Sequence, residues 1–281
     1  MRRAAALNLL KAWLLVAILA AAFGALGWLI GGSRPASLFA FCSLLAGVAV
    51  YWYGDRALLG SLGARPYALA EDPILRSTTD RLAAALAVAP PKLYLLDDGF
   101  PRAFAVGRGP RSSSLAVSTG LLAGLPPIEV EAVLAHELAH VRARDVLTQT
   151  SAVLLALTLV EVSRVGGWLS RALLFVLAPV AAAFVHLLIS PRRELAADTA
   201  AAAVAASPHD LADALLRLDG ASGLVQFAAS PATEPLYPVN PFASDKLSRM
   251  FNTHPPLATR VTALRRLGDA APHPTVRRED E

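Results

Sequence analysis

Two long uncharged runs near the start of the chain constrain its fold more than any other feature. Residues 12–31 and 36–54 contain no Asp, Glu, Lys or Arg, and only residues 32–35 separate them. About 20 helical residues, at about 1.5 Å per residue, span the hydrocarbon core of a bilayer. The runs therefore predict a hairpin of two membrane helices. A cleaved signal peptide is the alternative for the first run, because basic residues precede it.

The composition agrees with a membrane protein. Hydrophobic residues make up 55% of the chain and charged residues 17%, and the mean hydropathy is +0.48. This apolar share exceeds that of ordinary soluble domains. The formal charge is only +4 and the basic residues are scattered, so we expect no nucleic-acid partner. Cys42 is the only cysteine, which excludes a disulfide within one chain.

Two further apolar stretches lie between residues 146 and 190. Residues 172–189 carry no acidic or basic charge except a possible one on His186, and a membrane helix tolerates Pro179. Residues 146–160 include four consecutive polar residues at 148–151, so a buried core helix is an alternative for this stretch. We expect a second transmembrane pair, which makes the chain a multi-pass protein with the lipid bilayer as a partner.

Basic residues predict the orientation of the four expected spans. Nine lie on the side of the N-terminus and three on the other side. The nine are Arg2, Arg3, Lys11, Arg56, Arg65, Arg142, Arg144, Arg192 and Arg193, and the three are Arg34, Arg164 and Arg171. By the positive-inside rule, the N-terminus and the aqueous parts face the cytoplasm.

The chain divides into five predicted parts: a hairpin at 1–54, aqueous segments at 55–145 and 191–269 around the second apolar pair at 146–190, and a polar, disordered tail at 270–281. Periodicity, prolines and turn residues predict helices at 74–88, 128–144, 192–206, 209–218 and 258–267. Short strands are predicted at 92–96, 103–106 and 115–118. The predicted fold class is a mainly α membrane protein that also contains a small sheet.

The predicted helix 128–144 carries the sequence His136-Glu137-Leu138-Ala139-His140. Four residues of helix place both imidazoles on one face, which suits two ligands of a tetrahedral zinc ion. Glu137 lies beside the first histidine, where a carboxylate can take a proton from a metal-activated water. Such a short match also arises by chance, so it needs support elsewhere in the chain.

A second helix offers that support at Glu194 and Asp198. A carboxylate on another helix is the usual third ligand for such a histidine pair, and Asp198 can orient a ligand histidine through its other nitrogen. A solvated acidic patch at a helix start is the alternative interpretation. Glu194 must share one side of the membrane with His136 and His140, so the chain between them crosses twice or not at all.

These motifs occur in an order that resembles the HtpX-type membrane metallopeptidases, relatives of the CAAX prenyl proteases. The matching segments are residues 116–122, 129–145, 193–198 and Thr253-His254-Pro255-Pro256, and the resemblance extends to about Leu267. It implies an α+β zincin-like protease domain that holds one Zn²⁺ per chain, and protein or peptide substrates. Damaged or misassembled membrane proteins are the implied targets, cleaved at the cytoplasmic face of a bacterial-type inner membrane.

The resemblance also implies roles for individual residues. His136, His140 and Glu194 bind zinc, Glu137 is the acid/base, and His254 stabilises the oxyanion. Supporting positions are Asp198, Arg260 and Asp145, the last without an assigned role. The substrate-binding positions are Arg102, Ala103 and Phe104, together with Leu115, Ala116 and Val117, where an extended substrate can pair with the strand; a strand that only completes the sheet is the alternative.

One position departs from the family pattern. The family usually reads Pro-Asn-Ala-Phe-Ala, and this chain reads Pro101-Arg102-Ala103-Phe104-Ala105. An arginine donates hydrogen bonds but cannot accept them, and it adds a positive charge. We therefore expect an altered substrate preference, toward acidic or C-terminal segments. Two other functions remain open: a catalytically inactive membrane scaffold, and a CAAX-type prenyl-peptide protease, against which the small number of apolar spans argues.

Overall fold

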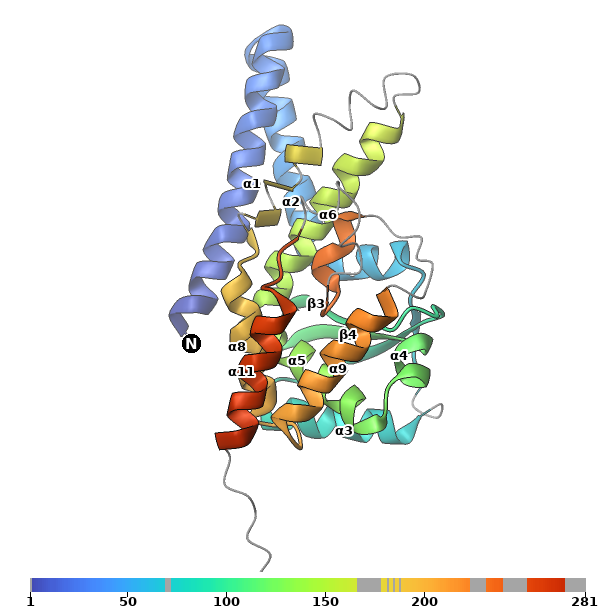
Figure 1. The fold of residues 1–281 in the computed structure, drawn as a ribbon. Helices are drawn as coiled ribbons and strands as arrows, with labels where there is room; N and C mark the ends of the chain where they lie inside the picture. Colours follow the sequence, from blue (N-terminus) through green and yellow to red (C-terminus); the bar gives the residue numbers. More distant parts are fainter. Residues whose placement is uncertain are drawn as a thin grey trace, which may run out of the picture.

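The chain begins with two long helices that fold back on one another. In this computed structural model the described residues are 2–68, 72–165, 178–180, 182–183, 185–186, 188–222, 231–239 and 252–270. Helix α1 (Arg2–Gly31) and helix α2 (Ser33–Ser61) meet at Gly32, whose φ of 78° closes the turn. Figure 1 shows this hairpin rising away from the rest of the molecule.

The hairpin is tightly packed inside and apolar outside. A Cβ atom on Gly27 would lie 2.5 Å from the carbonyl oxygen of Pro35, so only glycine allows the two backbones to approach this closely. Large apolar side chains such as Trp28, Leu29 and Phe41 are exposed on its outer surface. Water disfavours such a surface and lipid favours it. Among the described helices, Ser33–Ser61 is the one long and apolar enough to cross a membrane.

Helix α6 (Asp145–Val165) packs against both helices of the hairpin. Leu154 of α6 lies so close to Gly54 of α2 that a Cβ atom there would lie 3.0 Å from the Leu154 Cδ1 atom. In Figure 1, α6 runs upward beside the hairpin, away from the sheet. Its apolar part, Asp145–Thr158, is shorter than a full span. The expected stretch at 172–189 lies partly outside the described residues, and those described between 178 and 188 are helical.

A mixed four-stranded sheet lies below the hairpin, with the order β1-β2-β4-β3. Its strands are β1 (Arg65–Pro66), β2 (Lys92–Leu96), β3 (Ala103–Gly109) and β4 (Ser112–Ser118). Strand β4 pairs in parallel with β2, for example Leu93 with Leu115, and antiparallel with β3, for example Ala105 with Leu115. The β3–β4 turn depends on Gly107, whose φ is 136° and whose Cβ atom would clash with the Ser112 backbone.

Helices cover this sheet and enclose the main core. They are α3 (Pro73–Ala85), α4 (Thr119–Gly124), α5 (Pro127–Ala143), α8 (Pro191–Ala202), α9 (Pro208–Ser222) and α11 (Leu257–Ala270), with a short 3₁₀ helix, η2 (Pro231–Leu236). Helix α5 is central: it contacts β3, α3, α8 and α9. Figure 1 shows α8, α9 and α11 lying around α5.

The sequence predicted the positions of the helices well and the lengths of the strands less well. The predicted helices at 74–88, 128–144, 192–206, 209–218 and 258–267 are confirmed within a few residues, as is the strand at 92–96. The other two predicted strands are longer than expected and form a hairpin. The mainly helical class with a small sheet is therefore confirmed. The expected tail beyond residue 270 lies outside the described residues.

Candidate metal centre

Helix α5 carries both histidines into the interior of the protein. It begins after Pro126, with Pro127 in its first turn, and ends where Arg144 adopts a left-handed conformation with φ of 62°. Because α5 is packed on several sides, His136 and His140 are almost completely buried. Their Nε2 atoms lie 3.2 Å apart, as expected for neighbours one helical turn apart.

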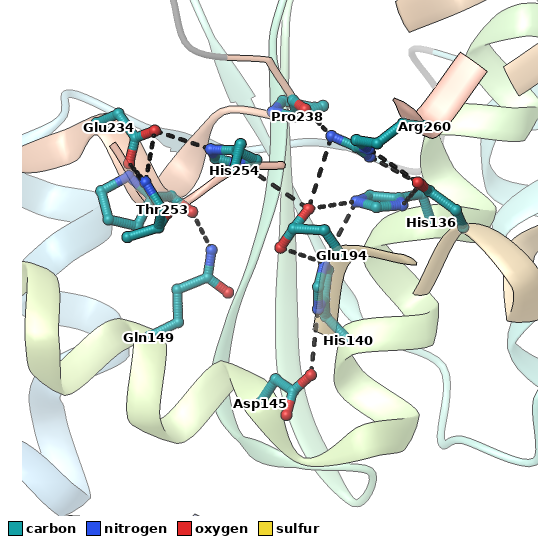
Figure 2. A network of polar contacts seen from close by, with 12 residues as sticks. His136, His140, Asp145, Gln149, Glu194, Glu234, Pro238, Thr253, His254 and Arg260 are labelled. Atoms are coloured by element: carbon teal, nitrogen blue, oxygen red, sulfur yellow. Dashed lines mark hydrogen bonds and ion pairs between the residues drawn. The ribbon is translucent and has the colours of Figure 1, made fainter. Parts of the chain in front are cut away.

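Glu194 of α8 completes a group of three possible metal ligands. Its Oε2 atom lies 3.5 Å from His136 Nε2, and its Oε1 atom lies 3.4 Å from His140 Nε2. One ligand atom from each residue lies within 4.8 Å of the others, and all three residues are buried. Figure 2 shows the three side chains pointing toward one another from α5 and α8.

The other nitrogen of each histidine faces an aspartate. His136 Nδ1 lies 2.9 Å from Asp198 Oδ1, and His140 Nδ1 lies 3.3 Å from Asp145 Oδ2. If each Nδ1 carries the proton that its aspartate accepts, each Nε2 is a bare acceptor. Two acceptor nitrogens and a carboxylate then converge on one point, an arrangement that fits a cation. Two imidazoles and one carboxylate are ligands that suit zinc.

The charges around the cluster favour a positive ion in it. Burial alone lowers the pKa of His140, but Glu194 and Asp145 raise it to about 10. Burial alone raises the pKa of Glu194, yet His140 and His254 hold it well below its ordinary value. The protein without metal therefore retains protons at this site. The same negative charges attract a metal ion in their place.

Arginines hold the two aspartates in place. Arg260 of α11 is buried and binds Asp198 through two contacts, Nε to Oδ2 at 2.8 Å and an η nitrogen to Oδ1 at 2.7 Å. Arg193 of α8 binds Asp145 through one contact of 2.9 Å. The structure thus places the expected supporting residues Asp198, Arg260 and Asp145 around the histidines, and Arg193 is a supporting residue that the sequence did not reveal.

Glu137 lies between the histidines and the sheet. Its Oε2 atom accepts a hydrogen bond of 2.9 Å from the backbone nitrogen of Ala105 in β3. Burial raises the pKa of Glu137, although His136 and His140 oppose the shift. A carboxylate with a raised pKa takes up a proton more readily than an exposed one, which is what a general base requires.

His254 reaches the cluster from the other side. Its Nε2 atom lies 3.7 Å from Glu194 Oε2, and its Nδ1 atom lies 2.8 Å from Glu234 Oε1. Burial lowers the pKa of His254, but Glu234 and Glu194 raise it. Glu234, on η2, was missed by sequence reasoning. The only signal for it was an acidic residue in a proline-rich segment without periodicity.

The expected substrate-binding residues lie in two different environments. Ala103 and Phe104 belong to β3, the edge strand that contacts α5. Leu115, Ala116 and Val117 belong to β4, which is paired with β2 on one side and β3 on the other. Both edges of β4 are therefore occupied, and the expected pairing of a substrate strand with residues 115–118 is wrong. The alternative, that this strand completes the sheet, is the one observed.

Arg102 is buried beside the site rather than in an open groove. An η nitrogen of Arg102 donates to the Tyr237 hydroxyl at 2.7 Å, and another lies 2.6 Å from Asp98 Oδ2. The guanidinium also lies 5.5 Å from the centre of the Tyr237 ring, a cation–π contact. Asp98 balances its charge. An effect of Arg102 on substrate preference stays a prediction, which cleavage profiles of the wild type and Arg102→Asn would test.

Comparison with known proteins identifies the class to which this site belongs. The profile described as Peptidase family M48 matches residues 69–267, a range that contains the three metal-ligand candidates, Glu137 and His254. The chain belongs to peptidase family M48. A protease HtpX homolog of Acidiphilium cryptum is 38% identical over 92% of this chain and 96% of its own length. The protease HtpX of Legionella pneumophila is 34% identical over 92% and 99%.

Membership of the M48 family gives the protein its general function. It is a membrane metallopeptidase that uses a metal cofactor and acts on proteins or peptides. The expected resemblance to HtpX-type enzymes is confirmed, and the His136–His140–Glu194 cluster offers a site for the metal ion. The apolar hairpin agrees with the membrane assignment.

Proposed function

We propose that the protein is a zinc-dependent endopeptidase that cleaves damaged or misassembled membrane proteins. The observation that carries this proposal is the convergence of two imidazole nitrogens and a carboxylate in a buried site, with a second carboxylate beside them. In this proposal His136, His140 and Glu194 hold one zinc ion per chain. When bound, zinc lowers the pKa of water and polarises a carbonyl group.

The side chains supply the remaining steps of peptide hydrolysis. Glu137 takes the proton of the attacking water and later gives it to the leaving amine; its raised pKa suits both transfers. His254 lies on the opposite side of Glu194 from α5 and donates to the negative oxygen that develops on the scissile carbonyl. An extended substrate pairs with the edge of β3, where the Ala105 amide points toward Glu137.

The placement of the site relative to the membrane is part of the proposal. Residues 1–54 form one transmembrane hairpin, and residues 146–190 form a second pair that divides the protease domain into residues 55–145 and 191–269. The exposed apolar surface of α1 and α2 and the direction of α6 support this arrangement. The excess of arginine and lysine on the side of the N-terminus supports an active site that faces the cytoplasm.

Glu137→Gln tests the proposed chemistry most directly. Glutamine keeps the shape of the side chain and cannot act as a base, so we expect casein cleavage in detergent to fall by at least about 1,000-fold while zinc stays bound. Glu131→Gln is the matched control: it lies on the same helix and pairs with Arg81 at 2.6 Å, away from the histidines. Unchanged cleavage by Glu137→Gln would exclude the proposed mechanism.

Cleavage of a prenylated peptide distinguishes the proposed function from the alternative, a CAAX-type prenyl-peptide protease. A CAAX-type enzyme cleaves prenylated peptides and prefers them to their unmodified forms. We expect this protein to cleave casein and to gain nothing from the prenyl group. A strong preference for the prenylated peptide would instead favour the CAAX-type activity.

A further inference from the structure

Glu234 is a carboxylate in an unusual position for its charge. It is completely buried, and among the residues that the structure describes no lysine or arginine pairs with it. Its oxygens accept hydrogen bonds from Thr253 Oγ1 at 3.1 Å, from the Thr253 backbone nitrogen at 3.3 Å, and from His254 Nδ1 at 2.8 Å. A buried carboxylate is strongly unfavourable unless such partners satisfy it. The imidazole of His254 is thus its one ionic partner in the described chain.

The segment that carries Glu234 is held by three separate parts of the protein. Arg102, just before β3, donates to the Tyr237 hydroxyl, and Gln149 of α6 donates to the carbonyl oxygen of Pro235. Arg260 of α11 donates to the carbonyl oxygen of Pro238. The C-terminal end of η2 and the two residues that follow it are therefore fixed relative to the metal centre. A side chain on such a fixed segment, here Glu234, can in turn hold a neighbouring side chain in one orientation.

We propose that Glu234 is a positioning residue that sets the orientation of His254. It holds the Nδ1 atom, and this leaves the Nε2 atom facing the metal ligands, 3.7 Å from Glu194 Oε2. Figure 2 shows the chain of contacts from Glu234 through His254 to Glu194. An acidic residue also faces Nδ1 in His136 and His140, but His254 differs from them because it must carry a proton on Nε2 as well in order to donate. Here the oriented atom serves the reacting carbonyl, so the inference rests on the proposed function.

A double-mutant cycle tests whether Glu234 acts through His254. The variants are Glu234→Gln, His254→Ala and the two combined, assayed with a peptide that gives separate kcat and KM values. We expect Glu234→Gln to lower kcat about 10-fold, the lower end for partners of this kind, with KM and bound zinc unchanged. In the His254→Ala background the same change should have no further effect, because the group that Glu234 orients is gone.

Glu129→Gln is the matched control for the loss of a buried carboxylate. Glu129 is also buried, lies in the first turn of α5 seven residues before His136, and pairs with Arg217 of α9 at 2.8 Å. We expect it to lower thermal stability and leave kcat unchanged. If Glu129→Gln lowered kcat as much as Glu234→Gln does, the effect would reflect general loss of stability and the proposal would be wrong.

Thr253→Val serves if Glu234→Gln does not fold. It removes the Oγ1 hydrogen bond to Glu234 and keeps the charge, so kcat should fall by a smaller factor, again only when His254 is present. If Glu234→Gln or Thr253→Val lowered kcat by the same factor in the His254→Ala protein as in the wild type, Glu234 would not act through His254 and the proposal would be wrong. Glu137→Gln distinguishes a wrong role for Glu234 from a wrong mechanism. If Glu137→Gln retains full activity, the proposed mechanism of peptide hydrolysis is itself wrong.

Discussion

The two histidines of the metal centre are supported in different ways. Asp198 faces His136 at 2.9 Å and is bound twice by Arg260, a residue 1% exposed. Asp145 faces His140 at 3.3 Å and is bound once by Arg193, whose side chain is 15% exposed. The first support connects α5, α8 and α11, and the second connects α8 with the junction of α5 and α6.

This difference separates two ways of fixing a metal ligand. Two parallel contacts between a guanidinium and a carboxylate fix both planes, and burial removes competing water. Arg193 contacts one oxygen of Asp145 and is itself more exposed than Arg260, so this arginine contact is more open to competition from water. His136 is therefore the rigid ligand of the pair. The aspartate that faces His140 has a single arginine contact and lies on the helix that follows His140 in the sequence.

Replacing each aspartate by asparagine should show the difference between the two supports most clearly. An amide keeps the shape and removes the charge that favours the histidine proton on Nδ1. We expect zinc affinity to fall about 100-fold in Asp198→Asn and about 10-fold in Asp145→Asn, the two ends of the usual range for such partners. Competition with a chelator measures both constants. Equal losses would mean that the second contact of Arg260 contributes nothing to the site.

Replacing each arginine by lysine tests the geometry of the contacts. Lysine keeps the charge but cannot make two parallel contacts. We expect Arg260→Lys to lower the free energy of unfolding by about 2 kcal/mol, because one of the two buried hydrogen bonds to Asp198 is lost. Arg193→Lys should lower it by less, because lysine can keep the single contact with Asp145. Denaturant titration of the metal-free protein in detergent gives both values, and the reverse order would contradict the assignment of the rigid support.

The pH dependence of stability offers a finer test. Burial raises the pKa of Asp198, but the hydrogen bonds from Arg260 and His136 outweigh it and lower the pKa below the ordinary value of 3.8. A carboxylate with a lowered pKa in the folded state stabilises the protein above its unfolded pKa, and this stability is lost as the pH falls through the folded value. The difference in thermal midpoint between wild type and Asp198→Asn, without metal, should therefore be largest above pH 5 and shrink toward pH 3. A constant difference would show that the charge of Asp198 does not stabilise the fold.

Helical periodicity predicted the residues whose relation is local, and the family resemblance supplied the distant His254 and Arg260, but neither revealed Glu234. His136 and His140, like Glu194 and Asp198, are four residues apart on one helix, so helical periodicity alone places each pair on one face. Glu234 and His254 are 20 residues apart in a proline-rich region, and no periodicity links them. Only the packing of η2 brings them together.

The order of the strands in the sheet could not be predicted from the sequence, for a related reason. Residues 103–106 and 115–118 are both short and apolar, and nothing local distinguishes an edge strand from an interior one. The pairing of β4 with β2 joins segments about 20 residues apart, and it decides that β3 is the edge. The expectation of a substrate strand on residues 115–118 was wrong for this reason.

Because Glu137 accepts a hydrogen bond from the Ala105 amide, substrate binding at β3 would exchange one hydrogen bond for another. Without substrate, the base and the edge strand satisfy each other. On the proposed β3 site, a peptide carbonyl takes the amide while the carboxylate turns to water, so the number of hydrogen bonds hardly changes. A single hydrogen bond contributes only about 1 kcal/mol net even when it is newly formed. The peptide backbone therefore contributes little affinity at this position, and the side chains of the substrate must decide which chains are held long enough to be cut.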